Sequence, residues 1–194
     1  MPANKGRKLP PELLTADDVR ALLAACSTSA PTGLRNRALV VVLYRAGLRL
    51  DEALSLTPAG VDCAHSVLAV GDPVRVAGID SAALAIVEQW LDARGRLRLP
   101  ADGPLFCTLG GGPLHPAYVR QLLPRLAAKA GIGKRVHAQG LRYSHAAELA
   151  AEGLPAELIR AQLGHESLAS TDRYLRRVPP PDRIGALQRR QWSP

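Results

Sequence analysis

The spacing of apolar and polar positions predicts a mainly helical chain. Thr15 and Asp18 form a capping-box pattern ahead of the apolar spacing of DVRALLAAC, which predicts a first helix. After a loop, STSAPTG, the segment NRALVVVLYRAG is apolar on all sides, which indicates a buried helix that ends at Gly47. A short helix through LRLDEALSL, closing at Pro58, is expected next.

One segment has the pattern of strands. SVLAVGDPVRVAGI alternates apolar and small residues around a Gly-Asp-Pro turn, as a short β-hairpin does. From Asp80 the helical pattern returns in DSAALAIVEQWLDARG, AYVRQLLPRLAAKAG, LRYSHAAELAAEG and PAELIRAQLGH. Pro124 is expected to kink or shorten the second of these, and Gly153 and Gly164 to end the last two. The fold class is therefore mainly α with a small β-hairpin or sheet (α+β), in one compact domain.

Length and composition agree with a single packed domain. The 194 residues suffice for one full core, and with 47% hydrophobic but 4% aromatic residues that core must be mainly Leu, Ala and Val. No run approaches the roughly 18 apolar residues of a membrane span, and MPANKGRKLP lacks the apolar region of a signal peptide. We therefore expect a soluble, cytoplasmic protein. The three cysteines are widely spaced, which predicts core thiols and no metal site.

The charge balance favours a polyanionic partner. Lys and Arg number 25 against 17 Asp and Glu, which gives a net charge of +8 and a pI near 10.0. Most of the positive charge is arginine, whose planar fork binds phosphate in a bidentate way. Nucleic acid is the natural partner of such a protein. A GC-rich genome would also enrich arginine, so the charge alone does not decide the function.

The stretch LGHESLASTDRYL, residues 163–175, carries the candidate chemistry. It places Tyr174 among basic residues, and an exposed tyrosine can act as a covalent nucleophile. When the group attacked is a phosphate, arginines from other parts of the chain are expected to clamp it. Arg49, directly after the buried helix, and Arg142, at the start of LRYSHAAELA, are the candidates. His165 follows Gly164, and its ring is a candidate to donate to a phosphate oxygen or to transfer a proton near neutral pH.

Each of these residues also has a purely structural explanation when it is taken alone. Arg49 could pair with Glu52 one turn on, and Arg142 could be an ordinary ion-paired arginine. His165 could cap a helix, and Tyr174 could be a half-buried helix residue. The functional interpretation depends on the order and spacing of all four.

The order of GLRLDEALSL, GLRYSHAAELA and LGHESLASTDRYL resembles the tyrosine recombinase (phage integrase) family, and the resemblance covers nearly the whole chain. It implies that Arg49 and Arg142 hold the scissile phosphate of double-stranded DNA and that His165 hydrogen-bonds it. Tyr174 would then attack and form a 3′-phosphotyrosyl link, as in the recombination or integration of mobile elements. Glu52 would brace the site from behind.

The resemblance also implies partners and further contacts. Arg75 and Lys134 are candidates for DNA binding. No cofactor is implied, since the energy kept in the phosphotyrosyl link lets a second 5′-hydroxyl reverse the reaction without ATP or metal. The partners are double-stranded DNA and further copies of the chain, with a monomer in solution and a tetramer on synapsed sites.

Two positions depart from the family pattern. An alignment of the hairpin sequence without gaps places Val70 at the position of the family's catalytic lysine. Gln139 stands where the family usually has histidine, three residues before Arg142. Valine cannot donate a proton, and an amide can donate a hydrogen bond but carries no charge. His137 is nearby in sequence but at a different position. The departures leave open a catalytically weak, DNA-binding accessory or regulatory protein, or a fold-only relative that binds RNA or protein.

The expected organisation is a basic tail over residues 1–10, a tyrosine recombinase catalytic domain over residues 11–178, and a C-terminal tail over residues 179–194. The family resemblance makes this last tail a candidate helix for docking on a neighbouring protomer. Most of the family also carry an N-terminal helical domain that clamps DNA, and residues 1–10 are too short for it. A single-domain form and a fragment of a longer protein both fit this sequence.

Overall fold

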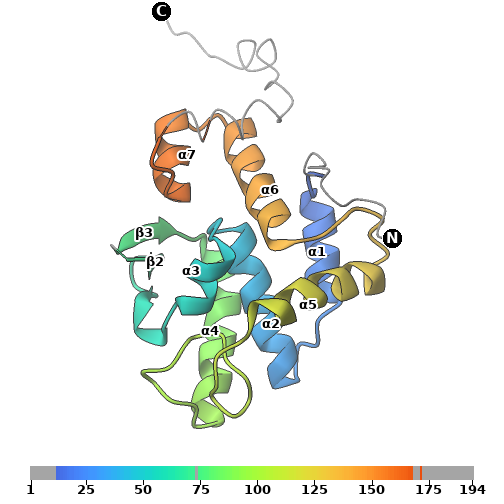
Figure 1. Ribbon diagram of the computed structural model, residues 1–194, viewed down its shortest axis with the longest axis vertical. Helices are drawn as coiled ribbons and strands as arrows, with labels where there is room; N and C mark the ends of the chain where they lie inside the picture. The colour runs from blue at the N-terminus through green and yellow to red at the C-terminus, as the bar shows by residue number, and fades with distance from the viewer. Residues whose placement is uncertain (1–11, 73, 168–170, 172–194) are drawn as a thin grey trace, which may run out of the picture.

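The computed structural model describes residues 12–72, 74–167 and 171 of the chain. Within these ranges helices predominate and one small sheet is present (Figure 1). The helices are α1 (Ala16–Ala24), α2 (Pro31–Tyr44), α3 (Leu50–Ser55), α4 (Ser81–Arg96), α5 (Pro116–Lys129), α6 (Ala138–Ala151) and α7 (Ala156–Leu163). A 3₁₀ turn covers Pro58–Gly60, and the strands are β1 (Val61–Asp62), β2 (Val67–Val70) and β3 (Arg75–Gly78). The predicted fold class is confirmed.

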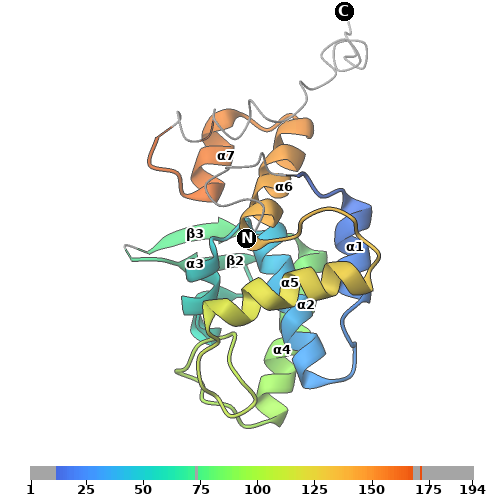
Figure 2. The same cartoon turned by 45° about the vertical axis from the view of Figure 1, so that its right-hand side comes forward.

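Helix α2 is the centre of the core. Residues 38–44 are all buried, which confirms the expectation from a segment that is apolar on every side. α1, α4 and α6 pack against it, and α5 crosses in front of it in the view of Figure 2. Within the described ranges, no helix has both the length and the apolar character to cross a membrane.

The sheet is antiparallel, in the order β1-β2-β3, so β3 lies at one edge. Leu68 on β2 pairs with Ala77 on β3, and both face the core; Val70 pairs with Arg75 two positions along the same strands. Helix α7 packs against β3, above it in Figure 1, which brings the LGH turn next to the hairpin. The hairpin was predicted, whereas β1 was not, because two residues are too few to show alternation.

Helices α2 and α5 differ from their predicted forms. Helix α2 begins at Pro31, so the last residues of the expected STSAPTG loop form its first turn, a position that suits proline. Helix α5 runs from Pro116 to Lys129 without interruption, so the expectation that Pro124 shortens it is wrong. Pro124 and Arg120, one turn earlier, are both exposed, so water can bind the carbonyl that loses its amide partner.

Gly47 makes the sharp turn between α2 and α3. Its φ is +62°, and the amide of Leu48 reaches back to the carbonyl of Val42 at 3.2 Å, as in a glycine-terminated helix end. A Cβ at Gly47 would lie 2.5 Å from Cδ2 of His145 and 2.9 Å from Cδ2 of Leu163. The turn therefore needs glycine for both its backbone conformation and its space.

We expect Gly47→Ala to lower the free energy of unfolding by about 2–4 kcal/mol, because left-handed strain adds to overpacking. Gly131→Ala is the matched control, since Gly131 has φ +69° but no atom within 4 Å of a Cβ. It should cost about 1 kcal/mol, from strain alone. Urea unfolding measures both, and equal losses would contradict the steric part of the explanation.

Candidate active site

Glu52 on α3 is the buried centre of the candidate site. Its carboxylate accepts hydrogen bonds from Nε and Nη2 of Arg75, at 3.0 and 2.9 Å, and from the backbone N–H of Arg49 at 2.7 Å. Burial alone would raise the pKa of Glu52, but these hydrogen bonds and the charges of Arg75 and Arg142 outweigh it, so the pKa is lowered. The carboxylate is therefore ionised and can hold several guanidinium groups in place.

Arg142 on α6 is the most deeply buried of those guanidinium groups, with 1% of its surface exposed. Its Nη1 donates to the carbonyl of Gly47 at 2.5 Å and lies 3.8 Å from Oε2 of Glu52, while Nη2 donates to the carbonyl of Leu163. One side chain thus connects the turn after α2 with the end of α7. A buried cation in this position depends on those partners.

Arg49 also pairs with Glu52, on the solvent-exposed side of this carboxylate. Its Nη1 is 3.6 Å from Oε1 of Glu52 and its Nη2 donates to the carbonyl of Gly164 at 2.9 Å, yet its side chain is 44% exposed. Arg49, Arg75 and Arg142, which we call the arginine cluster, all pair with the single carboxylate of Glu52. Positive charge therefore exceeds negative charge here, and an anion is the complementary ligand.

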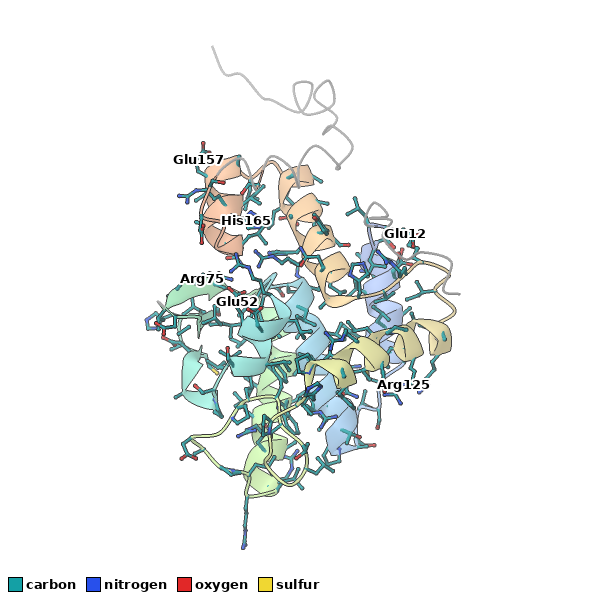
Figure 3. The ribbon with its side chains drawn as sticks, in the orientation of Figure 1. Glu12, Glu52, Arg75, Arg125, Glu157 and His165 are labelled. Carbon is teal, nitrogen blue, oxygen red and sulfur yellow. The ribbon has the colours of Figure 1, made fainter. Side chains whose placement is uncertain are left out.

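His165 completes the arrangement at the end of α7. Figure 3 shows it close to Arg75 and Glu52, between α7, β3 and α3. Its Nδ1 lies 2.9 Å from Oγ1 of the fully buried Thr171. If the Thr171 hydroxyl donates to Nδ1, Nε2 carries the proton and becomes the donor of the ring.

Burial, followed by the charges of the arginine cluster, lowers the pKa of His165 to about 4. The imidazole is thus neutral at pH 7 in the free protein. Hydrogen-bond donation to a phosphate oxygen needs no charge, and the role of His165 in proton transfer stays a prediction.

Gly164 allows the LGH turn to approach the hairpin. Its φ is +61°, and a Cβ there would lie 2.4 Å from Nε of Arg75. Arg75 occupies that space, donating from Nη1 to the carbonyl of Gln162 at 2.9 Å as well as binding Glu52. Arg75 thus makes its hydrogen bonds inside the domain, and the DNA contact that the sequence suggested for it stays a prediction.

Gln139 and His137 both lie at the start of α6, and their positions show whether His137 can substitute for the histidine absent at position 139. Gln139 is exposed in the first turn of α6. His137 is the N-cap of that helix, and its Nδ1 accepts the backbone N–H of Gly140 at 3.0 Å. Its imidazole therefore serves the helix end and does not replace the histidine missing at position 139.

Lys134, Val70 and Tyr174 are the remaining residues predicted from the sequence. Lys134 pairs with Asp18 of α1 at 2.6 Å, and this hydrogen bond is the main reason that the pKa of Asp18 is lowered. Val70 is 3% exposed and packs in the core. Tyr174 lies outside the described residues.

Three features of the site were not predicted from the sequence. Thr171 and Gln162 were overlooked because their side chains are ordinary polar helix or loop types, and nothing local reveals their partners. The pairing of Arg75 with Glu52 joins residues 23 positions apart. The one available signal was that Arg75 lies on the same face of β3 as the buried Ala77, which directs it inward.

Two buried histidines should make stability depend on pH. Burial is also the main reason that the pKa of His145 is lowered to about 4, and neither of its ring nitrogens has a hydrogen-bond partner among the described residues. The unfolded chain binds these protons near pH 6.5 and the folded chain only near pH 4, so stability is lost as the pH falls between those values. We expect a loss of about 1.4 kcal/mol per pH unit for each of His145 and His165.

Urea unfolding at a series of pH values measures this dependence. His145→Leu should remove about half of the slope. A slope that is the same in the His145 variant as in the parent would contradict the assignment.

The mainly helical fold and the arginine cluster beside an LGH turn define the chain as a helical domain with a site for an anion. The family model for the phage integrase family matches residues 12–179. The chain belongs to the phage integrase family. Among the described residues, no group of three or more His, Cys, Asp or Glu side chains is placed to hold a metal ion.

Individual relatives agree with this assignment. The chain is 36% identical over 177 residues to the tyrosine recombinase XerC of Alcanivorax borkumensis, covering 89% of this chain and 58% of that protein. It superimposes on the crystal structure of XerA recombinase with a TM-score of 0.79 at 25% identity, over 99% of this chain and 68% of that one. The XerH recombinase in a pre-cleavage complex with difH substrate gives 0.73 at 25% identity, over 93% of this chain and 52% of that one. The chain thus spans less than two thirds of the curated relative.

Proposed function

We propose that this chain is the catalytic domain of a site-specific DNA recombinase that cuts and rejoins DNA through a 3′-phosphotyrosyl intermediate. The observation that carries the proposal is the arginine cluster, in which three guanidinium groups share one buried carboxylate. Arg49 is exposed enough to meet a ligand, and the neutral His165 stands beside it. A phosphodiester has the charge and the acceptor oxygens that this arrangement lacks.

In the proposed reaction, the phenolic oxygen of Tyr174 attacks the scissile phosphorus. The bond between that oxygen and phosphorus forms while the bond from phosphorus to the 5′-oxygen breaks. The phenol releases its proton to water, and the 5′-oxygen takes up a proton from water to leave as a hydroxyl. Arg49 and Arg142 stabilise the negative charge that develops on the phosphate oxygens, and His165 donates a hydrogen bond to one of them. Attack by the 5′-hydroxyl of a second strand reverses these bond changes and rejoins the DNA.

The leaving 5′-oxygen needs a proton, and the two positions that would supply it in the family are changed in this chain. Val70, at the position of the family lysine, is buried and has no proton to give, and Gln139 is an amide. A positioned acid or base typically contributes about 10²- to 10⁴-fold to the rate. The buried Val70 is thus the observation that favours the second candidate function, a DNA-binding accessory protein that cleaves slowly or not at all.

A suicide substrate separates the two candidates. The protein first selects its preferred duplex from a random pool by binding, so that the target is not guessed. A nick is then placed close to each candidate scissile position, so that cleavage releases a short oligonucleotide and traps the covalent adduct. A shifted band on a denaturing gel supports the recombinase, whereas tight binding without an adduct at any nick position supports the accessory protein.

The partners and location are proposed on the same basis. XerH is described in complex with its difH substrate, and we infer that double-stranded DNA is the ligand here too. Assembly of several copies on DNA would use the tail over residues 179–194, which lies outside the described residues. A pocket of about 430 Å³ between α6, α7 and β3 is a candidate acceptor; its lining combines Leu149, Leu154 and Leu158 with Arg45, Asp80 and His145. A cytoplasmic location remains part of the proposal.

A further inference from the structure

Gln162, near the end of α7, makes three side-chain hydrogen bonds to backbone groups beside the arginine cluster. Its Oε1 accepts the backbone N–H of Gly78 at 3.0 Å, and its Nε2 donates to the carbonyl of the same residue at 2.8 Å. The second hydrogen of Nε2 is donated to the carbonyl of Ala46 at 3.1 Å. The amide therefore joins three separate parts of the chain.

The three residues joined by this amide each lie three positions from a residue of the candidate site. Ala46 precedes Arg49 by three positions, Gly78 follows Arg75 by three, and Gln162 itself precedes His165 by three. The backbone carbonyl of Gln162 also accepts Nη1 of Arg75. A shift of the amide would consequently move all three segments relative to one another.

The chemistry of these contacts requires an amide. Two backbone carbonyls need donors and one backbone N–H needs an acceptor, and among side chains of this length and shape glutamine supplies both. A carboxylate could serve the N–H of Gly78 but would repel both carbonyls. Because β3 is an edge strand, Gln162 binds the outward-facing groups of Gly78 much as a further strand would.

We propose that Gln162 is a positioning residue for strand cleavage, whose amide sets how closely the LGH turn lies to β3 and to the turn before Arg49. The proposal rests on the recombinase function proposed above. Gln162 acts through these neighbours and does not itself contact DNA. A misplacement of about 1 Å between reacting groups can lower a rate by about 10²-fold, so an alignment device of this kind has a measurable effect.

The test compares Gln162→Met, which keeps the volume but removes all three hydrogen bonds, with Gln89→Met at an exposed position on α4. In Gln162→Met we expect adduct formation on the selected suicide duplex to slow by about 10- to 100-fold, while DNA affinity changes by less than about threefold. Gln162→Glu keeps the acceptor and loses both donors, and should slow the reaction as well. Urea unfolding of each variant gives the folded fraction.

A second measurement needs no DNA. The ring of His165 is titrated by NMR in the free protein, where the parent should show a pKa of about 4. In Gln162→Met the pKa should rise, because the ring moves away from the arginine cluster and becomes better hydrated. Gln89→Met should titrate as the parent does.

A residue that only caps an edge strand would lower the free energy of unfolding and leave both readouts unchanged. The proposal is overturned if the His165 titration in Gln162→Met matches the parent, or if adduct formation falls no further than the folded fraction does. If the parent forms no adduct on its own selected duplex, the recombinase function fails, and the titration alone then decides whether Gln162 positions the site.

Discussion

Replacing Tyr174 by phenylalanine is expected to abolish the covalent protein–DNA adduct, a loss of more than about 10³-fold in rate. The phenolic oxygen is the atom that would bond to phosphorus. Attack by a water molecule instead would leave no covalent bond between protein and DNA. The ring itself remains, so duplex affinity should change by no more than about twofold. Denaturing gels on the suicide duplex measure the adduct, and native gels measure the affinity.

Tyr118→Phe is the matched control for this experiment. Its hydroxyl accepts from Arg35 at 2.6 Å and donates to Asn36, on the α5 side of the core. Losing that hydroxyl should lower stability by about 1 kcal/mol and leave adduct formation intact in the folded protein. An adduct of undiminished yield in Tyr174→Phe would refute the assignment of the nucleophile.

Arg142→Lys should damage both the reaction and the fold. Lysine keeps the charge, but its single ammonium cannot reach Gly47, Leu163 and Glu52 together as the planar guanidinium does. Removal of one well-placed donor to an oxyanion typically lowers a rate by about 10²- to 10³-fold, and we expect that loss in adduct formation. The free energy of unfolding should fall by about 2–4 kcal/mol, since buried partners are left unpaired.

Arg49→Lys separates these two effects. Arg49 meets the same carboxylate, but its exposed side chain can be rehydrated when the contact is lost. We expect a comparable loss of adduct formation with a change in unfolding free energy below about 1 kcal/mol. Equal destabilisation in the two lysine variants, measured by urea unfolding, would show that burial does not distinguish the two arginines.

Local signals predicted most of the fold. The capping box of Thr15 and Asp18 is present as expected, with reciprocal hydrogen bonds of 2.8 and 3.2 Å. The all-round apolar character of α2 predicted its central position, and Gly47 and Gly164 both adopt the left-handed conformation that a helix end favours. These features depend on residues a few positions apart, which is the range that periodicity and capping rules describe.

The location of the site was partly predictable for a different reason. The order of the boxes around Arg49, Arg142 and His165 suggested that they meet, and the fold does bring them together around Glu52. Their burial was not predictable. Which arginine is enclosed, and that His165 is held neutral by its surroundings, depends on packing between α6, α7 and the hairpin.

Interactions between a side chain and distant backbone escaped prediction altogether. Gln162 binds Ala46 across 116 positions and Gly78 across 84, and no local pattern encodes such contacts. The prediction for Pro124 was wrong for the opposite reason, because packing outweighed a local rule. A rule about local backbone chemistry predicted a kink or a shorter helix, but α5 packs well enough, through Leu122, Leu123 and Leu126, to keep its full length.

The arginine cluster has an energetic meaning beyond ligand binding. Three cations around one anion repel one another, so the domain carries unfavourable electrostatic energy at this site. A chain selected for stability alone would exchange one of these arginines for an uncharged side chain. Keeping them assembled before a phosphate arrives means that the work of gathering like charges is done during folding. In the proposed reaction, the domain would thereby trade some resistance to unfolding for a smaller reorganisation at the moment of attack.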